Sequence, residues 1–570
     1  MTYSAPVDDF TFLFDHVVGL DQVVATDRFA EASADITQAI LREAGKMCED
    51  VLAPLQRAGD LSPAVLENGV VRTPPGYADG WKAIAEGGWV AIAADPEFGG
   101  MGLPMTVTTA VNEMMSGACL SLQLAPLMSQ GQIEALEHHA SAEIKALYLP
   151  KLISGEWTGT MNLTEPQAGS DVGALTTKAD PQGDGTYKIT GQKIYISWGD
   201  HDVADNVCHL VLARLPGAPA GTKGISLFLV PKRLPDDNGE AGVANSLKVV
   251  SLEHKMGLHG SPTCVMSYDG ATGWMVGPEN GGMAAMFTMM NNARLGVGGQ
   301  GIGVAEAAYQ HALAYARDRK QGRTAVDGAG TIIDHADVRR MLMQMRADIF
   351  AARAIALMCA TAIDMETASG DTHWRARAAL LTPIAKAFGT DIGNAVAQTG
   401  VQIHGGMGFI EETGAAQFSR DVRVTTIYEG TNGIQAMDLV ARKMMDGGEA
   451  ASALLDEIEA QAEAARADMP ELAEPVWQAT ETLREATEWL VSQGNMNDRF
   501  AGAVPYLTGF ARVLGGYAHL MAARADRGGP REKLARFYIN RLLPEHSGLL
   551  AQAQKGAEDL FDMTVEELSA

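Results

Sequence analysis

Residues 187–197 read YKITGQKIYIS, an alternating stretch that is rich in β-branched side chains. A period of two predicts a β-strand. Similar strand-like runs occur at residues 207–214, 224–230 and 263–268, with Gly, Pro and Asn between them. Because no helical pattern separates these short strands, we expect a small antiparallel barrel or sandwich in this part of the chain.

Helical spacing of apolar residues surrounds this β-rich segment on both sides. The helical candidates are residues 29–58, 81–92 and 107–127 before it, and 305–319, 336–365 and 375–400 after it. A helical tail continues beyond about residue 450. We therefore expect a mainly α chain with a β insert. Its expected domains are an N-terminal helical domain (1–157), a middle β domain (158–282), a C-terminal helical bundle (283–446) and an additional helical domain (447–570).

The composition is that of an ordinary globular protein with several packed units, since the chain has 570 residues, of which 46% are hydrophobic and 20% charged. Its 70 acidic and 44 basic residues give a net charge of −26. Such a chain is a poor general binder of nucleic acid or of anionic membranes, because both need basic patches. It has no apolar run of spanning length and no signal-peptide pattern at its start, so we expect a cytoplasmic protein.

Metal and disulfide chemistry are not expected from the cysteine pattern. Five cysteines are widely spaced, at positions 48, 119, 208, 264 and 359, and no CxxC pair occurs. This pattern disfavours zinc ribbons and disulfide scaffolds. His404 has no second His or carboxylate at metal-ligand spacing, which leaves no candidate metal site.

One candidate binding loop is the segment LTEPQAGSD, residues 163–171. Thr164 and Ser170 flank a turn that is built around Pro166 and Gly169. Such a loop exposes backbone N–H groups and hydroxyls that can bind a polar ligand. A plain β-turn is an equally good interpretation of these residues alone.

A second candidate is QIHGGMGF, residues 402–409, whose three glycines allow a ligand such as a phosphate to approach the backbone closely. The basic cluster RDRKQGR at residues 317–323 has two interpretations. It is either a solvated helix end, where the dipole favours cations, or a phosphate clamp.

The segment IYEGTNG, residues 427–433, contains a candidate general base. Glu429 follows Val424, Ile427 and Tyr428, which read as an apolar, strand-like run. Most single glutamates are surface residues. A carboxylate in apolar surroundings, however, has a raised pKa and can act as a general base.

Gly296, Gly298 and Gly301 match the GxGxxG pattern of dinucleotide-binding turns. That chemistry needs a strand immediately before the glycines. Residues 283–294 are Met-rich and helix-like instead. We therefore favour small residues that allow two helices to approach closely.

Taken together, TEPQAGSD, the Arg-Lys-x-Gly at 319–322, QIHGGMGF and IYEGT resemble, in this order, the motifs of the acyl-CoA dehydrogenase flavoproteins. The resemblance covers about residues 80–445. It implies a helical N-terminal domain, a middle β-barrel domain and a C-terminal four-helix bundle. The tail beyond residue 450 resembles that of a subgroup with an added helical domain.

The resemblance implies FAD as cofactor and assigns residues to it. The implied FAD contacts are Met161, Leu163, Thr164, Gly169, Ser170, Tyr195, Ser197, Arg319, Gln402, His404, Gly405, Gly406 and Thr431. The implied substrate contacts are Ser170, Asn291, Arg294 and Tyr428. Tyr195 stands where the family usually has Trp, and Ser197 where it has Thr, so an aromatic ring and a hydroxyl are retained. The family's R-x-x-F-G lacks its Phe after Arg319.

The resemblance also implies the reaction, an FAD-dependent α,β-dehydrogenation of a short acyl-CoA to the trans-2-enoyl-CoA. It points to 3-(methylthio)propanoyl-CoA as substrate, to Glu429 as base and to an electron-transfer flavoprotein as electron acceptor. Some relatives carry the base at the position of Ala293, which cannot act as one. Arg319 matches an arginine that reaches a neighbour's FAD, which implies an oligomer. The family forms dimers or tetramers, and we expect a homodimer because the added helical tail could cover the surface through which tetramers pair.

Two alternatives within the same fold remain open at this point. One is an acyl-CoA oxidase that uses oxygen directly. The other is a DNA-binding flavoprotein of the alkylation response, which needs a basic face. The basic residues of the tail support it locally, while the net charge argues against it; these residues are Arg524, Arg527, Arg531, Lys533, Arg536 and Arg541.

Overall fold

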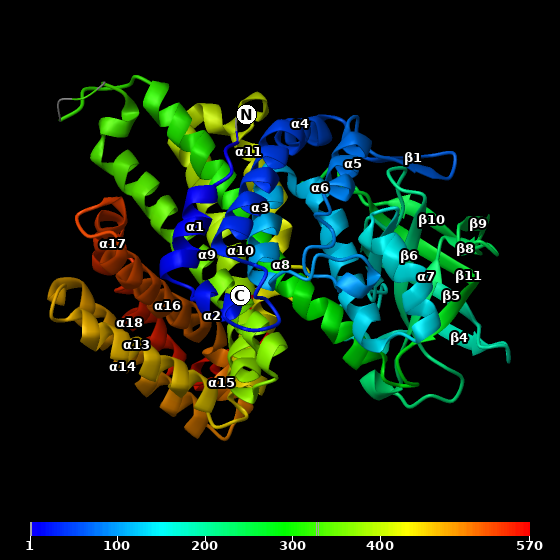
Figure 1. Ribbon diagram of the computed structural model, residues 1–570. Coiled ribbons are helices and arrows are strands. Elements are labelled where there is room, and N and C mark those ends of the chain that lie inside the picture. The colour runs from blue at the N-terminus through cyan, green and yellow to red at the C-terminus, as the bar shows by residue number, and fades with distance from the viewer. Residues whose placement is uncertain (1–2, 326–327, 329) are drawn as a thin grey trace. The chain divides into compact units, whose positions relative to one another are not determined.

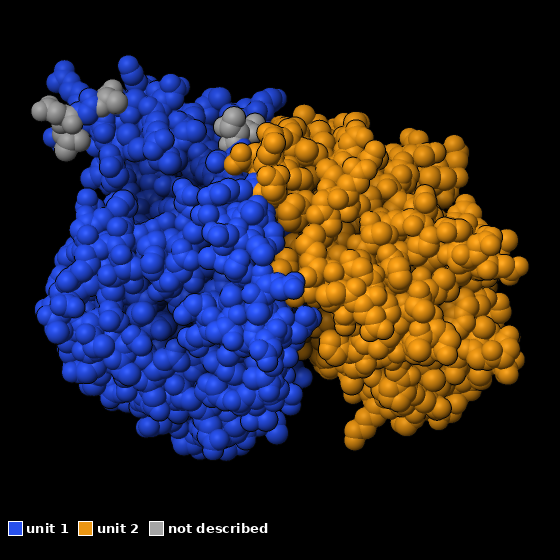
Figure 2. Space-filling model, in the orientation of Figure 1, with its two compact units in different colours: residues 1–42, 104–113, 294–570 blue, residues 43–103, 114–293 orange. Residues whose placement is uncertain are grey.

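In the computed structural model, which describes residues 3–325, 328 and 330–570, helices precede and follow one larger sheet along the chain (Figure 1). The chain separates into two compact units (Figure 2). Unit 1 consists of Met1–Arg42, Pro104–Glu113 and Arg294–Ala570, and unit 2 of Glu43–Leu103 and Met114–Ala293. The four domain bounds expected from the sequence stay a prediction.

The sheet of unit 2 contains the strand with which the sequence pattern begins. Its order is β3-β6-β7-β11-β5-β4, and β10 pairs with β11. These strands are β3 (Trp157–Asn162), β4 (Lys178–Pro181), β5 (Tyr187–Ser197), β6 (Asn206–Ala213), β7 (Ser226–Pro231), β10 (Leu247–Leu252) and β11 (Thr263–Val276). The strand predicted at 187–197 is confirmed to the residue.

The expectation of a purely antiparallel arrangement is wrong at one edge of this sheet. β3 and β6 run parallel, with Thr160 opposite His209. A parallel pair needs a long crossover, and the chain between these strands supplies one because it also forms β4 and β5. The other pairs in the sheet are antiparallel.

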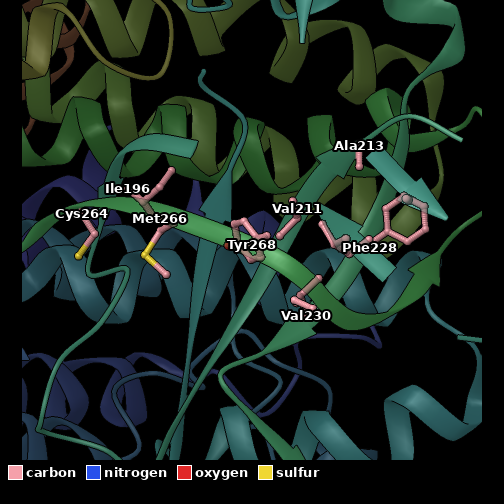
Figure 3. Packing of buried hydrophobic residues seen from close by; sticks show 11 residues of the cluster. Ile196, Val211, Ala213, Phe228, Val230, Cys264, Met266 and Tyr268 are labelled. Atoms are coloured by element: carbon pink, nitrogen blue, oxygen red, sulfur yellow. The ribbon is translucent and has the colours of Figure 1, made fainter. Parts of the chain in front are cut away.

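Apolar side chains from five strands, β4, β5, β6, β7 and β11, form a buried core against this sheet (Figure 3). Ile196 of β5, Val211 of β6, Phe228 of β7 and Met266 of β11 are all almost completely buried. β6 and β7 are buried along their whole length, so both of their faces are covered, whereas β5 has an exposed face. This difference explains why only β5 shows clear alternation in the sequence.

The helices before the sheet follow the predicted segments with three changes. The helix expected at 81–92 begins and ends earlier, at Tyr77–Glu86, because the glycines at 87 and 88 end it in a turn. The helix expected at 29–58 is divided into α3 (Ala34–Met47), a π-helical turn (Cys48–Leu52) and α4 (Ala53–Leu61). α6 (Met105–His139) is kinked at Cys119, whose φ is −155° and ψ 89°. The remaining elements before the sheet are α1 (Val7–His16), α2 (Leu20–Val24), β1 (Val65–Glu67), β2 (Val70–Arg72), α5 (Tyr77–Glu86) and α7 (Ala142–Ile153).

Long helices make up most of unit 1. α8 (Gly282–Asp318), α9 (Ala336–Ser369) and α10 (Thr372–His404) include the three predicted long segments, except that Arg319 lies one residue beyond α8. α9 packs along both α10 and α16 (Ala503–Ala525). The other helices of the tail are α13 (Glu449–Ala465), α14 (Pro470–Ser492), α15 (Met496–Ala501), α17 (Pro530–Arg541), α18 (Glu545–Ala553) and α19 (Glu558–Asp562). In the part of the chain that is described, no helix is long and apolar enough to cross a membrane.

The GxGxxG glycines belong to a close crossing between α8 and α10. A Cβ on Gly301 would lie 2.5 Å from the carbonyl oxygen of Gly389, and one on Gly298 would lie 2.8 Å from that of Ala385. In return, a Cβ on Gly393 would lie 2.6 Å from the Gly301 oxygen. The glycines lie inside a continuous helix rather than after a strand, so the packing interpretation is confirmed.

A buried cluster of charges joins helices that are distant in sequence within unit 1. The guanidinium of Arg353 on α9 is completely buried and lies 2.9 Å from Asp9, 2.6 Å from Glu113 and 2.9 Å from Glu306. Asp9 also pairs with Arg531 on α17. Buried charges are tolerated only when they are paired, so this cluster fixes how α1, α6, α8, α9 and α17 meet.

Candidate active site

Glu429 lies in a tight turn between two short helices of unit 1. α11 (Ala415–Val422) leads into a 3₁₀ helix (Arg423–Thr426), and α12 (Asn432–Val440) follows. The strand-like interpretation of the preceding residues is wrong. The backbone N–H groups of Ile427 and Tyr428 both donate to the carbonyl of Val424, which continues a helical turn, and three apolar residues are too few to distinguish the two periods.

The backbone of this turn is unusual at two successive residues. Glu429 has a φ of +55° and Gly430 one of +83°. Such a left-handed conformation costs a non-glycine residue about 1–2 kcal/mol and persists only where its surroundings enforce it. Here the amide of Gln435 donates to the Glu429 carbonyl at 3.1 Å, and the Thr431 hydroxyl caps α12 by accepting from the Ile434 N–H. The strain therefore lies at the candidate base itself.

The surroundings of Glu429 suit a general base. Its side chain is half-buried, and burial raises its pKa to about 7, while the charges of Arg294 and Lys386 act in the opposite direction. Arg294 on α8 is only 6% exposed, and burial lowers its pKa while Asp438 and Glu429 oppose that shift. A carboxylate that titrates near neutrality is matched to proton abstraction at physiological pH.

Two further predicted substrate residues lie close to these in sequence. The hydroxyl of Tyr428 donates to the side-chain oxygen of Gln300 on α8, and burial raises its pKa. Asn291 is exposed on α8, whereas its neighbour Asn292 donates to Glu134 of α6 at 2.7 Å. Sequence reasoning missed Glu134, whose pKa burial raises to about 7, because nothing in its local sequence marks it.

The loop at residues 163–171 in unit 2 is a turn, as predicted. Glu165 and Ala168 exchange two backbone hydrogen bonds, of 3.0 and 2.9 Å, across Pro166. The Glu165 carboxylate is buried and accepts from the Lys193 ammonium at 2.9 Å and from the backbone N–H of Thr177 at 3.0 Å. Although burial alone would raise its pKa, Lys193 and these hydrogen bonds lower it to about 2.

This ion pair holds the loop against β5, and sequence reasoning missed it. Lys193 also donates to the Leu163 carbonyl at 2.9 Å. Glu165 lies in the loop segment 163–171 and Lys193 in the strand-like stretch 187–197, so an acidic and a basic residue in these two segments are the signal that could have paired them. Around the loop, Met161 and Thr164 are half-buried, Leu163 is buried, and Gly169 and Ser170 are exposed.

Tyr195 presents an aromatic ring to solvent near the C-terminal end of β5. Its φ is +60°, and the pairing of β5 with β11 shifts register between Lys193 and Ile196. This bulge leaves the ring 61% exposed, while Ser197 is half-buried. The next residue, Trp198, is completely buried and donates to the Ser121 carbonyl at 3.0 Å. At this end of β5, the ring of Tyr195 is therefore open to a ligand, whereas the indole of Trp198 is part of the interior.

The second glycine loop begins where α10 ends. Gln402, Gly405 and Gly406 are exposed, and a Cβ on either glycine would meet nothing within 4 Å. His404 differs from them, because it is buried, bonds the Gly400 carbonyl at 2.7 Å and stacks on Tyr315. Arg319 is exposed just beyond α8. His404 is thus positioned by packing, and its neighbours are open to a ligand.

No cluster of three or more His, Cys, Asp or Glu side chains that could hold a metal ion occurs in the part of the chain that the structure describes. The basic residues of the tail largely have partners inside unit 1. Arg531 pairs with Asp9, Arg536 with Glu471 and Glu532, and Arg524 donates to Gln461. This pairing removes much of the local support for a DNA-binding face.

Four family models match the chain along most of its length. They are the N-terminal domain (residues 35–156), the middle domain (160–271) and the C-terminal domain (280–445) of acyl-CoA dehydrogenases, and an acetyl-CoA dehydrogenase C-terminal-like domain (454–564). The chain belongs to the acyl-CoA dehydrogenase family. It is accordingly an oxidoreductase with the acyl-CoA dehydrogenase fold and an added C-terminal helical domain.

Individual acyl-CoA dehydrogenases are similar over almost the whole chain. The 3-methylmercaptopropionyl-CoA dehydrogenase of Ruegeria pomeroyi is 45% identical over 94% of both chains. A butyryl-CoA dehydrogenase of Syntrophomonas wolfei is 35% identical over 80% of this chain and 78% of its own. Among solved structures, ACDH-11 of Caenorhabditis elegans superposes with a TM-score of 0.80 at 20% identity, covering 99% of this chain and 96% of its own, which shows the shared fold.

Acyl-CoA dehydrogenases are flavoproteins, and the residues of this chain fit a flavin nucleotide. Gly169, Gly405 and Gly406 leave open space where a side chain would stand, which suits close approach of a phosphate to the backbone. Ser170 offers an exposed hydroxyl, and Tyr195 offers an exposed ring for a flat heterocycle. Such groups are chemically suited to bind the phosphates and the ring system of a flavin nucleotide.

Proposed function

We propose that the protein is an FAD-dependent dehydrogenase of short acyl-CoA thioesters, with 3-(methylthio)propanoyl-CoA as its substrate. The product is the trans-2-enoyl thioester, 3-(methylthio)acryloyl-CoA, an intermediate in the breakdown of dimethylsulfoniopropionate. The observation that carries this proposal is the 45% identity to the Ruegeria pomeroyi enzyme over 94% of the chain. An electron-transfer flavoprotein is the proposed electron acceptor.

In the proposed reaction, the Glu429 carboxylate removes the α-proton of the thioester. FAD, if bound by these residues, would supply the hydride acceptor for the β-hydrogen. The Glu429 backbone N–H is the proposed donor to the thioester carbonyl, where negative charge develops as the proton leaves. Arg294 and Lys386 favour the ionised form of Glu429 before the reaction, so the base is ready at neutral pH.

The residues proposed to hold FAD are those inferred from the family motifs, and their roles divide by chemistry. Ser170, Ser197 and Thr431 supply hydroxyls, Tyr195 a ring, and Arg319 a cation. Backbone from Met161 to Gly169 and from Gln402 to Gly406 supplies amides. We also propose the homodimer, in which Arg319 reaches the FAD of the second copy, and the domain bounds 1–157, 158–282, 283–446 and 447–570.

The substrate assignment is tested with a panel of thioesters on the purified holoenzyme. We expect kcat/KM to be highest for 3-(methylthio)propanoyl-CoA, with butanoyl-CoA next and long-chain thioesters at least tenfold lower. A higher value for a long-chain thioester would contradict the substrate assignment. Stoichiometric hydrogen peroxide formation, with no reduction of electron-transfer flavoprotein, would instead support the acyl-CoA oxidase alternative.

The pH dependence of turnover follows from the raised pKa of Glu429. Because only the carboxylate can take the α-proton, kcat/KM should rise about tenfold per pH unit below pH 7 and level off above it. The midpoint should therefore lie near pH 7, about two and a half units above that of an ordinary glutamate. Initial rates between pH 5 and 9 measure it, and a midpoint near 4.5 would contradict the role of burial.

A further inference from the structure

Lys386 on α10 is a completely buried lysine whose ammonium lies directly behind the Glu429 turn. It donates to the carbonyl oxygen of Gly430 at 2.9 Å and to the side-chain oxygen of Asn432 at 2.9 Å. Both acceptors are neutral. The other completely buried lysine described in the structure, Lys193, lies 2.9 Å from a carboxylate instead. Unlike Lys193, Lys386 thus donates to two neutral oxygens rather than to a carboxylate.

The first acceptor of Lys386 belongs to the strained part of the turn. Gly430 follows Glu429 directly, and both residues have positive φ. Lys386 binds the Gly430 carbonyl and Gln435 binds that of Glu429, so each of the two successive carbonyls has a side-chain donor. A turn of this kind reverts to a more ordinary conformation when its hydrogen bonds are lost. Lys386 is therefore one of two side chains whose hydrogen bonds hold this turn.

Charged groups from several elements lie around the turn and affect the pKa values of Lys386 and Glu429. Burial lowers the pKa of Lys386 to about 8, while Glu429 and Asp391 oppose that shift. Asp391 is linked to Lys386 through Asn432, whose amide donates to it at 2.8 Å. The charged and titratable groups that face this region are Arg294 from α8, Lys386 and Asp391 from α10, Arg423 and Tyr428 from the segment before Glu429, and Asp438 and Arg442 from α12.

We propose that Lys386 is a positioning residue for Glu429: its ammonium holds the strained turn and supplies positive charge that favours the ionised carboxylate. This inference rests on the proposed function, because it requires Glu429 to act as the base. Lys386 itself does not touch the substrate in this proposal. It acts through the Gly430 carbonyl and through its field at Glu429.

The test is the pH profile of single-turnover flavin reduction in the Lys386→Met holoenzyme, with butanoyl-CoA as the probe. Without the positive charge, the midpoint should move up by about one pH unit, so the rate should fall about tenfold more at pH 6.5 than at pH 9, where only the lost hydrogen bond to the Gly430 carbonyl still lowers it. KM should change less than threefold. Lys533→Met, which removes an exposed charge on α17, is the matched control and should leave the profile unchanged.

A second variant keeps the proposal testable if Lys386→Met does not fold. Asp391→Asn retains an oxygen for the Asn432 amide but removes the counter-charge of Lys386, so the midpoint should move down instead. Loss of rate by the same factor at all pH values in Lys386→Met, or an unmoved midpoint in Asp391→Asn, would overturn the inference. If Glu429→Gln still reduces its flavin at the wild-type rate, Glu429 is not the base and the proposed function itself is wrong. This outcome is distinct from a result that overturns only the role of Lys386.

Discussion

Glu429→Gln should lower the rate of flavin reduction by about a thousandfold while FAD stays bound. Glutamine has nearly the same shape as glutamate and can occupy the same turn, but its amide cannot accept the α-proton. Because the α-proton of a thioester is a weak acid, a missing base affects the chemical step far more than substrate binding. Anaerobic stopped-flow spectroscopy with excess acyl-CoA measures the effect at the flavin absorbance.

The control for this variant is Glu412→Gln, which neutralises an exposed glutamate seventeen residues earlier in the same unit (429 − 412 = 17). It should reduce its flavin at the wild-type rate. A visible spectrum with the flavin bands, and an unchanged melting temperature, would show that Glu429→Gln is folded and loaded. Turnover by folded, loaded Glu429→Gln within tenfold of the wild type would exclude Glu429 as the base.

Arg353→Leu should destabilise unit 1 more than any surface substitution. The change leaves Asp9, Glu113 and Glu306 without the cation that lies within 3 Å of each of them. Breaking a buried ion pair by removing one partner costs about 3–5 kcal/mol, because an uncompensated charge stays buried. Arg346 and Arg531 still pair with Asp9, so Glu113 bears most of the loss.

The measurement is the soluble yield and melting temperature of the purified variant at pH 7.5. Arg375→Leu serves as control, since Arg375 forms a 2.6 Å pair with Glu366 but is largely exposed, and such pairs contribute at most about 1 kcal/mol. Combining Arg353→Leu with Glu113→Gln should restore part of the stability. Equal melting temperatures for Arg353→Leu and Arg375→Leu would show that the cluster does not hold the helices together.

Local sequence patterns predicted the elements that have one buried and one exposed face. β5 alternates because one of its faces is exposed, so its bounds were found to the residue. The parallel pairing of β3 with β6 could not be predicted. Both strands are buried on both faces, and their sequences do not indicate whether neighbouring strands run parallel or antiparallel. The division of the first helix by a π-helical turn was likewise invisible in the apolar spacing.

In the candidate site, too, local motifs predicted some residues, whereas others could be found only from the tertiary structure. The motifs identified the loops and singled out Glu429, and the glycines of α8 were recognised as packing residues because no strand precedes them. What supports those loops was not found. Lys193 is 28 residues from Glu165 and Lys386 is 44 residues from Gly430, so each contact depends on tertiary structure. A single buried lysine in a helical sequence also looks the same as a surface one.

The pairing of Asp9 with Arg531 has a consequence for how the protein is made. These residues are 522 positions apart. At ordinary rates of translation, roughly half a minute to two minutes separate their emergence from the ribosome. Unit 2 is encoded entirely before residue 294, and so it can fold while synthesis continues. The partner of Asp9 on α17, in contrast, is made late, so this contact of the first helix can form only near the end of synthesis.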